Sequence, residues 1–127
     1  MPFLFDTNIF LEILLNQDKK EKAKQLLNNH LDQFFISDFS LHSIGVILIK
    51  QKKFRILEDF LNDIIPFATI LSLPKDKYSD LNKTAEKYNL DFDDSYQTTV
   101  AKEFDLAIVT MDNDFMKVKS LISVEFL

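Results

Sequence analysis

Cysteine is absent from this sequence, and glycine occurs only once, at Gly45. Without cysteine the chain forms neither a disulfide nor a thiolate metal site. Loops that cradle phosphates, such as GxGxxG and the P-loop, need several glycines close together. The single glycine therefore excludes Rossmann dinucleotide-binding domains and P-loop NTPases.

Long apolar runs are missing as well. No stretch of the sequence approaches the roughly 20 apolar residues that a membrane-spanning helix needs. The N-terminus also lacks the basic segment followed by an apolar stretch that is typical of a secretory signal. We therefore expect no membrane association, and together with the lack of cysteine these features favour a cytoplasmic location.

An excess of positive charge is the third absence. Twenty acidic residues against fifteen basic ones give a formal net charge of −5. A protein with this charge does not hold nucleic acid by its overall electrostatic field, so any such contact needs a local basic patch or a bridging metal ion. What the chain does have is 46% hydrophobic residues, including 13 phenylalanines, within 127 residues. That is enough for one packed core, and we expect a single domain over residues 1–127.

Short apolar runs alternate along the chain with segments of helical periodicity. The expected strands are 2–5, 33–36, 68–73, 106–110 and 122–126. The expected helices begin at about residue 8 and then cover 19–30, 38–53, 54–65, 74–88 and a segment from Asp93 or Asp94 to 104. Strands that alternate with helices form βαβ units, so the pattern predicts a three-layer α/β/α domain around a parallel sheet of about five strands.

Acidic residues follow the ends of two of these strands. Asp6 ends the first strand, Asp112 and Asp114 come shortly after the fourth, and Asp93 and Asp94 begin the helix that precedes the fourth. In open parallel sheets the functional crevice lies beyond the carboxyl ends of the strands. We therefore expect all five carboxylates to lie at the same end of the sheet.

Crowded carboxylates repel one another and take up protons unless a cation lies between them. Mg²⁺ and Mn²⁺ are hard ions that prefer oxygen ligands and retain several waters, so they fit such a group. An ion held in this way lowers the pKa of bound water and stabilises charge on a phosphodiester under attack. The cluster thus indicates hydrolysis of a nucleic-acid backbone.

Helix capping offers a simpler explanation for each acid separately. Asp6, Asp94 and Asp112 all stand near expected helix starts, where one capping hydrogen bond contributes about 1 kcal/mol. Capping does not explain why the three acids share one end of the sheet.

Three segments of the chain resemble the PIN domain family, which includes the toxin nucleases of VapBC-type toxin–antitoxin pairs: FLFDTNIFL near the start, ISDFSLHSIG, and LDFDDSYQTTVAKEFDLAIVTMDNDF near the end. The match covers almost the whole chain. The resemblance implies a ribonuclease that uses Mg²⁺ or Mn²⁺ to hydrolyse RNA phosphodiester bonds. It also implies an antitoxin protein as a partner and the formation of a homodimer.

The same resemblance assigns roles to individual residues. It implies that Asp6, Asp94 and Asp112 are the metal-binding catalytic acids, with Asp114 as a further metal ligand. The residues that it implies as supporting the site, by hydrogen bonds or by proximity, are Asn8, Asp93 and Thr110.

One position departs from the family pattern. The family usually has a Glu about six residues beyond the Ser that ends the second strand, here Ser37, and this chain has Ser43 there, beside His42. Either of those two side chains can hold a water or the substrate, while Asp38 or Glu12 can supply a charge from a different backbone position. The missing Glu also leaves open a PIN-fold binding or interaction module with impaired catalysis. A receiver-like domain phosphorylated on Asp fits less well, because no Lys stands at the end of the final strands, where such domains place one, and because Asp6-Thr7-Asn8 is not their usual acidic pair.

Two further features concern partners. Lys117 and Lys119 follow the last acids closely and are candidates for guiding an RNA backbone. The denser basic cluster 50–55 could also neutralise RNA phosphates, but a solvated helix end explains it better. The apolar stretches 41–49 and 54–65 either pack inside or leave a hydrophobic face for a second copy or a partner helix.

Overall fold

The computed structural model describes residues 2–127. Its elements in chain order are β1 (Phe3–Phe5), α1 (Thr7–Leu14), α2 (Lys20–Asn28), β2 (Phe34–Ser37), α3 (Asp38–Lys50), α4 (Phe54–Asp63), η1 (Ile65–Phe67), β3 (Ala68–Leu71), η2 (Lys75–Lys77), α5 (Tyr78–Tyr88), α6 (Phe92–Glu103), β4 (Ala107–Thr110), η3 (Asn113–Val118) and β5 (Val124–Phe126). The elements marked η are short 3-10 helices.

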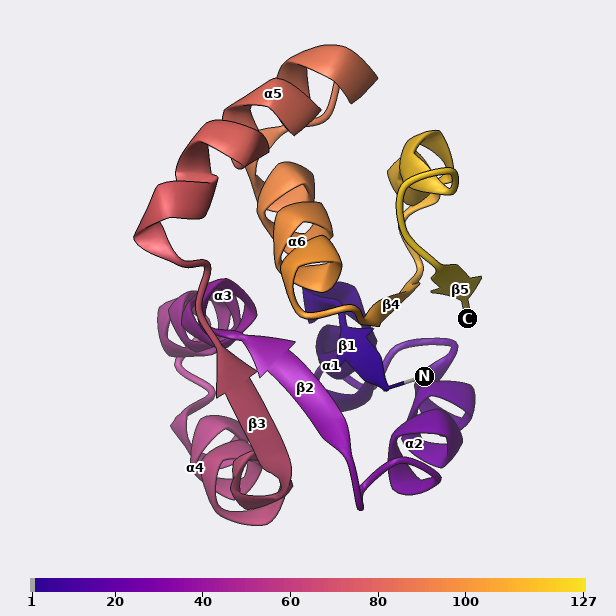
Figure 1. Ribbon diagram of the computed structural model, residues 1–127. Helices are drawn as coiled ribbons and strands as arrows, with labels where there is room; N and C mark the ends of the chain where they lie inside the picture. The colour runs from indigo at the N-terminus through magenta and orange to yellow at the C-terminus, as the bar shows by residue number, and fades with distance from the viewer. Residues whose placement is uncertain (1) are drawn as a thin grey trace.

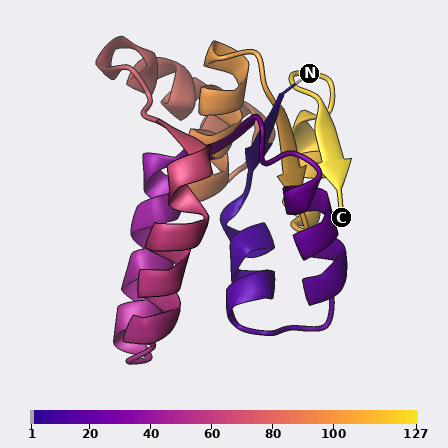
Figure 2. The same cartoon turned by 90° about the horizontal axis from the view of Figure 1, so that it is seen from below.

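The strands form one five-stranded sheet in the order β3-β2-β1-β4-β5. Every neighbouring pair in the sheet is parallel. Helices cover both faces: α1 to α4 lie on one side and α5 and α6 on the other, as the two views in Figures 1 and 2 show. The predicted three-layer α/β/α architecture with a parallel central sheet is confirmed.

The two cores of this architecture follow from the alternation of side chains along each strand. Leu4 packs with the cluster under α5 and α6, whereas its neighbour Phe5 packs with the cluster under α1 to α4. Ile108 and Val109 divide in the same way on β4. Successive strand residues point to opposite faces, so a strand covered on both sides reads as an unbroken apolar run.

The strand order creates a switch point beside β1. From β1 the chain continues to β2 on one side, and β4 later pairs with β1 on the other side. Ligands of open α/β sheets bind outside the carboxyl ends of the strands at such a point. Asp6 and Asp112 follow the two strands that flank it.

Several element boundaries differ from those expected. The helix expected to start at Asp93 or Asp94 begins at Phe92, because Asp91 is its N-cap and accepts a 2.9 Å hydrogen bond from the backbone N–H of Asp94. The expected helix 74–88 is split into η2 and α5, and the last strand starts at Val124. The short helix η3 was not predicted, since it has too few turns to show periodicity.

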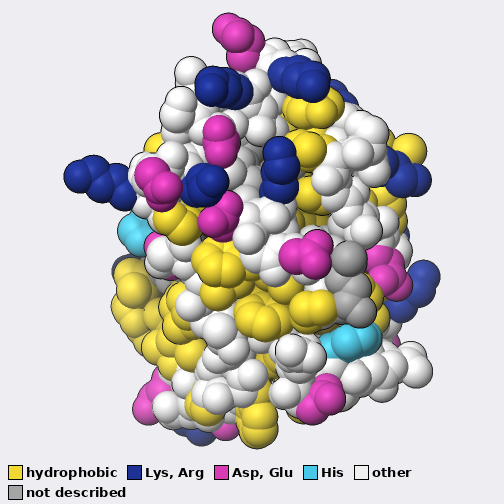
Figure 3. All heavy atoms as spheres, viewed as in Figure 1, with side chains coloured by type: hydrophobic (Ala, Val, Ile, Leu, Met, Phe, Trp, Pro, Cys, Tyr) yellow, Lys and Arg dark blue, Asp and Glu magenta, His cyan; other side chains and the backbone are white. Residues whose placement is uncertain are grey.

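The surface is divided by residue type. Charged side chains of both signs are mixed over α5 in the upper part of Figure 3, while hydrophobic side chains gather over α4 and β3 below. Apolar residues that remain about half exposed include Val46, Ile49, Phe54, Leu61, Phe67 and Ile70. Among residues 2–127, no helix combines the length and apolar character needed to cross a bilayer.

Candidate functional site

Asp6 lies at the carboxyl end of β1, where the strand turns directly into α1. Its carboxylate is buried and accepts four hydrogen bonds, two on each oxygen. Oδ1 accepts from the backbone N–H of Thr7 at 2.9 Å and from Gln97 Nε2 at 3.1 Å. Oδ2 accepts from Thr110 Oγ1 at 2.8 Å and from Asn8 Nδ2 at 3.3 Å. Asp6 therefore caps α1 and is held in one orientation from several elements.

Thr110 and Asn8 connect Asp6 to the loop after β4. Thr110 is fully buried, and its hydroxyl oxygen also accepts from the backbone N–H of Asp112 at 2.9 Å. Asn8 Oδ1 accepts from the backbone N–H of Met111 at 3.2 Å. These bonds fix the backbone that carries Asp112 relative to Asp6.

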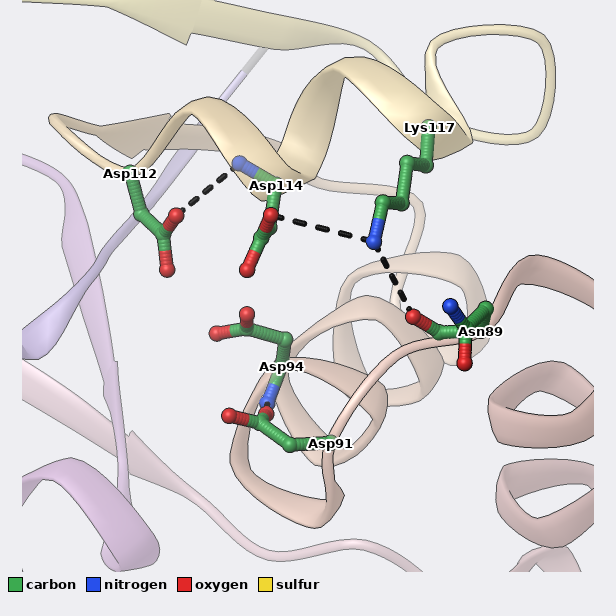
Figure 4. A network of polar contacts seen from close by, with 6 residues as sticks. All are labelled: Asn89, Asp91, Asp94, Asp112, Asp114 and Lys117. Atoms are coloured by element: carbon green, nitrogen blue, oxygen red, sulfur yellow. Dashed lines mark hydrogen bonds and ion pairs between the residues drawn. The ribbon is translucent and has the colours of Figure 1, made fainter.

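Asp94 lies in the first turn of α6 and is only 7% exposed. Because Asp91 already caps this helix, the Asp94 side chain is left to point out of the helix toward η3 (Figure 4). Burial, as the largest cause, and the charges of Asp112, Asp91 and Asp6 together raise its pKa to about 8. The capping explanation holds for Asp6 and Asp112 but not for Asp94.

Asp112 and Asp114 complete a three-carboxylate cluster with Asp94. Asp112 is half-buried, and Asp114 is exposed. Asp112 Oδ1 accepts from the backbone N–H of Asp114 at 2.9 Å, which caps η3. One carboxylate oxygen from each of the three residues lies within 4.8 Å of the others, and in Figure 4 the three side chains converge from α6 and η3. Asp6 lies outside this group of three.

A pocket of about 300 Å³ opens between these elements. It is lined by Asp6, Thr7, Asn8, Leu11, Phe39, Ser43, Ile47, Asp93, Asp94, Gln97 and Asp112. Burial also raises the pKa of Asp6, although its hydrogen bonds from Gln97 and Thr110 act in the opposite direction. The pKa of Asp93 is raised by partial burial and by the nearby charge of Asp91. The pocket thus gathers carboxylates whose ionised forms are disfavoured in the absence of a cation.

The donor set fits a hard divalent cation. Three carboxylates supply oxygen ligands from two elements, and the open side of the cluster leaves room for water or phosphate oxygens. A cation between the acids would offset the repulsion that raises the pKa of Asp94. Asp94, Asp112 and Asp114 are the residues that would hold such an ion.

Four residues were considered as replacements for the Glu that the family usually has after the second strand, and they lie in different places. Ser43 lines the acidic pocket. His42 and Asp38 line a neighbouring pocket. Glu12 is buried elsewhere, where its Oε2 accepts from the backbone N–H of Lys19 at 2.7 Å. The acidic pocket therefore has a hydroxyl, not a carboxylate, on α3.

Lys117 and Lys119, the two lysines expected to guide RNA, lie at different distances from the acids. Lys117 Nζ donates to the backbone carbonyl of Asn89 at 3.0 Å and lies 3.8 Å from Asp114 Oδ1, as Figure 4 shows. Lys119 lines a separate pocket together with Lys102 and Asp105. Only Lys117 lies beside the acidic cluster.

Gln97 is a site residue that the sequence analysis missed. It is 2% exposed, and its Nε2 donates to Asp6 Oδ1 and, at 2.8 Å, to Ser40 Oγ. Its Oε1 has no hydrogen-bond partner among residues 2–127. The signal available in the sequence was its spacing of three residues from Asp94, which puts both side chains on the same face of the helix.

Comparisons with known proteins agree with the fold. The family model described as the PIN domain matches residues 3–121. No curated protein sequence matches the chain. The FitAB structure bound to an IR36 DNA fragment is 18% identical and superimposes with a TM-score of 0.83, covering 98% of this chain and 94% of that chain.

Two further solved structures are similar. FitAcB from Neisseria gonorrhoeae is 21% identical with a TM-score of 0.78, covering 96% of this chain and 95% of that chain. VapBC2 from Rickettsia felis, bound to a DNA fragment from its promoter, is 18% identical with a TM-score of 0.77, covering 100% of this chain and 99% of that chain. At these identities the superpositions show a shared fold.

Proposed function

This chain belongs to the PIN domain family, and from that premise we propose that it is a divalent-metal-dependent ribonuclease of VapC-like type. The observation that carries the proposal is the convergence of Asp94, Asp112 and Asp114, whose carboxylate oxygens lie within 4.8 Å of one another. Carboxylates are brought this close at a cost in repulsion, which a bound cation removes. The proposed reaction is hydrolysis of RNA phosphodiester bonds.

Each acid has a distinct proposed role. Asp94, Asp112 and Asp114 hold the cation, and Asp6 adds its charge to the same pocket from a position fixed by hydrogen bonds. Bound Mg²⁺ or Mn²⁺ supplies Lewis acidity, which activates water and stabilises charge on the phosphodiester. Asp93 lines the open pocket beside Asp94, and its proposed role is to orient water.

Lys117 is the proposed contact for an RNA phosphate next to the cleaved bond. Its ammonium group lies beside Asp114 at the edge of the cluster. Once a cation occupies the acids, that ammonium group is free to pair with phosphate. Lys119, in its separate pocket, is proposed to contact the RNA only farther along the strand.

The test combines metal binding with cleavage in the wild type and in Asp94→Asn. We expect calorimetry to show saturable Mn²⁺ binding by the wild type and none by the variant. Cleavage of a mixed single-stranded RNA should be sensitive to EDTA in the wild type and absent in the variant. Asp63→Asn, on the exposed surface of α4, is the matched control and should behave like the wild type.

A second candidate rests on Ser43, which stands in the pocket where the family usually has a Glu. One carboxylate fewer weakens metal binding, and the chain would then be a PIN-fold interaction module without catalysis. In that case the wild type would bind no Mn²⁺ and cleave no RNA while remaining folded. Saturable Mn²⁺ binding coupled to turnover would eliminate this candidate.

We also propose a protein partner and a cytoplasmic location. The similar structures include FitAB, VapBC2 and a toxin–antitoxin complex from Klebsiella pneumoniae. Exposed apolar residues on α3 and α4, namely Val46, Ile49, Phe54 and Leu61, form what we term the α3–α4 apolar surface. We propose that an antitoxin covers this surface and that, without the antitoxin, a second copy of the chain does so.

A further inference from the structure

An aromatic pocket lies next to the acidic pocket. Its volume is about 400 Å³, within the range of about 300–1,000 Å³ typical of small-ligand sites. It is lined by Asp38, Phe39, His42, Tyr78, Phe92 and Tyr96. Tyr96 and Phe39 belong to the core under α5 and α6, whereas Phe92 and Tyr78 are exposed and serve neither that core nor the acidic cluster.

The rings of this aromatic pocket form a platform around Tyr96. Phe92 stacks on Tyr96 at a centroid distance of 6.4 Å and an interplanar angle of 24°. Tyr78 and Phe39 lie 6.2 Å and 5.6 Å from the same ring. Tyr96 is 3% exposed, but Phe92 is 54% and Tyr78 45% exposed. The outer rings thus offer neighbouring apolar surface to solvent, and contiguous exposed apolar surface of this kind is typical of binding sites.

The aromatic pocket is continuous with the acidic pocket. Phe39 lines both. On α6, Phe92 lines the aromatic pocket while the next two residues, Asp93 and Asp94, line the acidic one. A ligand with a phosphate at the acids therefore has its adjoining group beside these rings.

The polar groups of the aromatic pocket favour a base over a phosphate. None of the described residues that line it is Lys or Arg, and its carboxylate, on Asp38, repels phosphate. Asp38 Oδ1 accepts from Tyr96 Oη at 2.6 Å and from the backbone N–H of Phe39 at 2.7 Å. Oδ2 accepts only from Ser72 Oγ, at 2.9 Å, among residues 2–127. A carboxylate oxygen has two acceptor sites, so Oδ2 retains capacity for an N–H donor.

We propose that this aromatic pocket binds an unpaired nucleobase of the RNA substrate, next to the phosphate at the acidic cluster, and prefers bases with an exocyclic amino group. Stacking on Phe92 and Tyr78 supplies affinity for any base. The free acceptor capacity of Asp38 favours adenine, cytosine and guanine, which donate from an exocyclic amino group. Uracil has no amino group, and its ring N3–H lies between two carbonyl oxygens that the carboxylate repels. The proposal deepens the proposed ribonuclease function, on which it rests for the identity of the substrate.

The test measures binding separately from cleavage. Fluorescein-labelled six-nucleotide RNAs of adenosine, cytidine or uridine are titrated with the Asp112→Asn protein, which is expected not to cleave them, and binding is followed by anisotropy. In this background we expect Phe92→Ala to weaken binding of the adenosine oligomer about tenfold, a typical effect of losing one stacked base. Phe92→Trp should retain the affinity, and Phe104→Ala, at the far end of α6, is the matched control and should leave it unchanged.

Base preference gives the second readout. We expect the uridine oligomer to bind more weakly than the other two, and Asp38→Asn to narrow that difference. The proposal would be overturned if adding Phe92→Ala to the Asp112→Asn protein left binding unchanged, or if all three oligomers bound with equal affinity. Either result would count even if the wild type cleaves RNA. Binding that depends on Phe92 in a protein without nuclease activity would instead support the aromatic pocket and contradict the proposed ribonuclease.

Discussion

The acids of the site differ in how many hydrogen bonds their carboxylates already accept. Asp6 accepts four hydrogen bonds, and Asp112 caps η3. Asp94 is buried without a capping role, and its pKa is raised to about 8 by burial first and by neighbouring acids second. Among these acids, Asp94 combines a raised pKa with a carboxylate that caps no helix.

This shift predicts how the stability of the metal-free protein depends on pH. The folded state keeps the Asp94 proton up to about pH 8, whereas an unfolded chain loses it near the ordinary value of 3.8. Between these values the folded state binds more protons, so the free energy of unfolding falls as pH rises. We expect the Tm in EDTA to decrease from pH 5 to pH 8, and to decrease less in Asp94→Asn.

Thermal unfolding followed by circular dichroism checks this prediction. Mn²⁺ should raise the Tm of the wild type more at pH 8 than at pH 5, because at pH 5 the ion must displace the proton. The groups that face Asp94 are Asp112, Asp91 and Asp6, and all of them act in the same direction. If the Tm of the wild type and the Tm of Asp94→Asn decreased by the same amount between pH 5 and pH 8, the pH dependence could not be assigned to Asp94.

Helix α6 is the element that organises the site. Its N-cap is Asp91, its first turn carries Asp94, and Gln97 one turn later reaches Asp6 on the opposite side of the pocket. The same turns present Phe92 and Tyr96 to the aromatic pocket. A displacement of this helix end would alter both pockets together.

The cap of α6 gives a prediction at this scale. Asp91→Ala removes the hydrogen bond to the backbone N–H of Asp94 and should lower the free energy of unfolding by about 1 kcal/mol at pH 5. The loss should be smaller at pH 8, because removing the charge of Asp91 also lowers the pKa of Asp94. Denaturant titrations at the two pH values measure the difference.

Asp32→Ala, an exposed acid in the turn before β2, is the matched control and should change stability little at either pH. An Asp91→Ala variant as stable as the wild type at pH 5 would show that the cap contributes nothing.

At the scale of the whole molecule, charge and apolar area are unevenly distributed. The net charge of −5 opposes nucleic-acid binding, while exposed apolar side chains gather on α3 and α4. The sequence left open whether these stretches pack inside. In the structure Ile44 and Leu48 are fully buried, whereas Val46 and Ile49 are each 52% exposed. Each amphipathic stretch therefore contributes to the core and also leaves apolar side chains exposed on the surface.

Self-association through the α3–α4 apolar surface gives the prediction at the scale of the whole molecule. We expect the wild type to sediment as a dimer at micromolar concentration and the double variant Val46→Glu/Ile49→Glu to sediment as a monomer, because buried carboxylates without partners are strongly unfavourable. Met116→Glu, at a residue 53% exposed on η3, is the matched control and should remain dimeric. A monomeric wild type, or a double variant that still dimerises, would contradict the prediction.

The elements were predictable because their signals are local. Apolar runs that stop at Asp6 and Thr110 identify buried strands, and helical periodicity identifies the segments between strands. The predicted start of α6 was wrong by one or two residues, since three neighbouring acids compete as caps and only the backbone geometry selects Asp91. Gln97 was not recognised, because nothing nearby in the sequence identifies its partners, Asp6 and Ser40.

The sequence by itself determined the order of strands and helices and the positions of the acids after the strands, because both depend on residues that are neighbours along the chain. The tertiary structure decided which acids meet. Pairing of β1 with β4 brings Thr110 to Asp6 across a separation of 104 residues. The packing of α6 and η3 at the same end of the sheet makes Asp94, Asp112 and Asp114 a cluster and leaves Asp6 beside it. Such contacts join segments far apart in the sequence, and no local pattern encodes their distances.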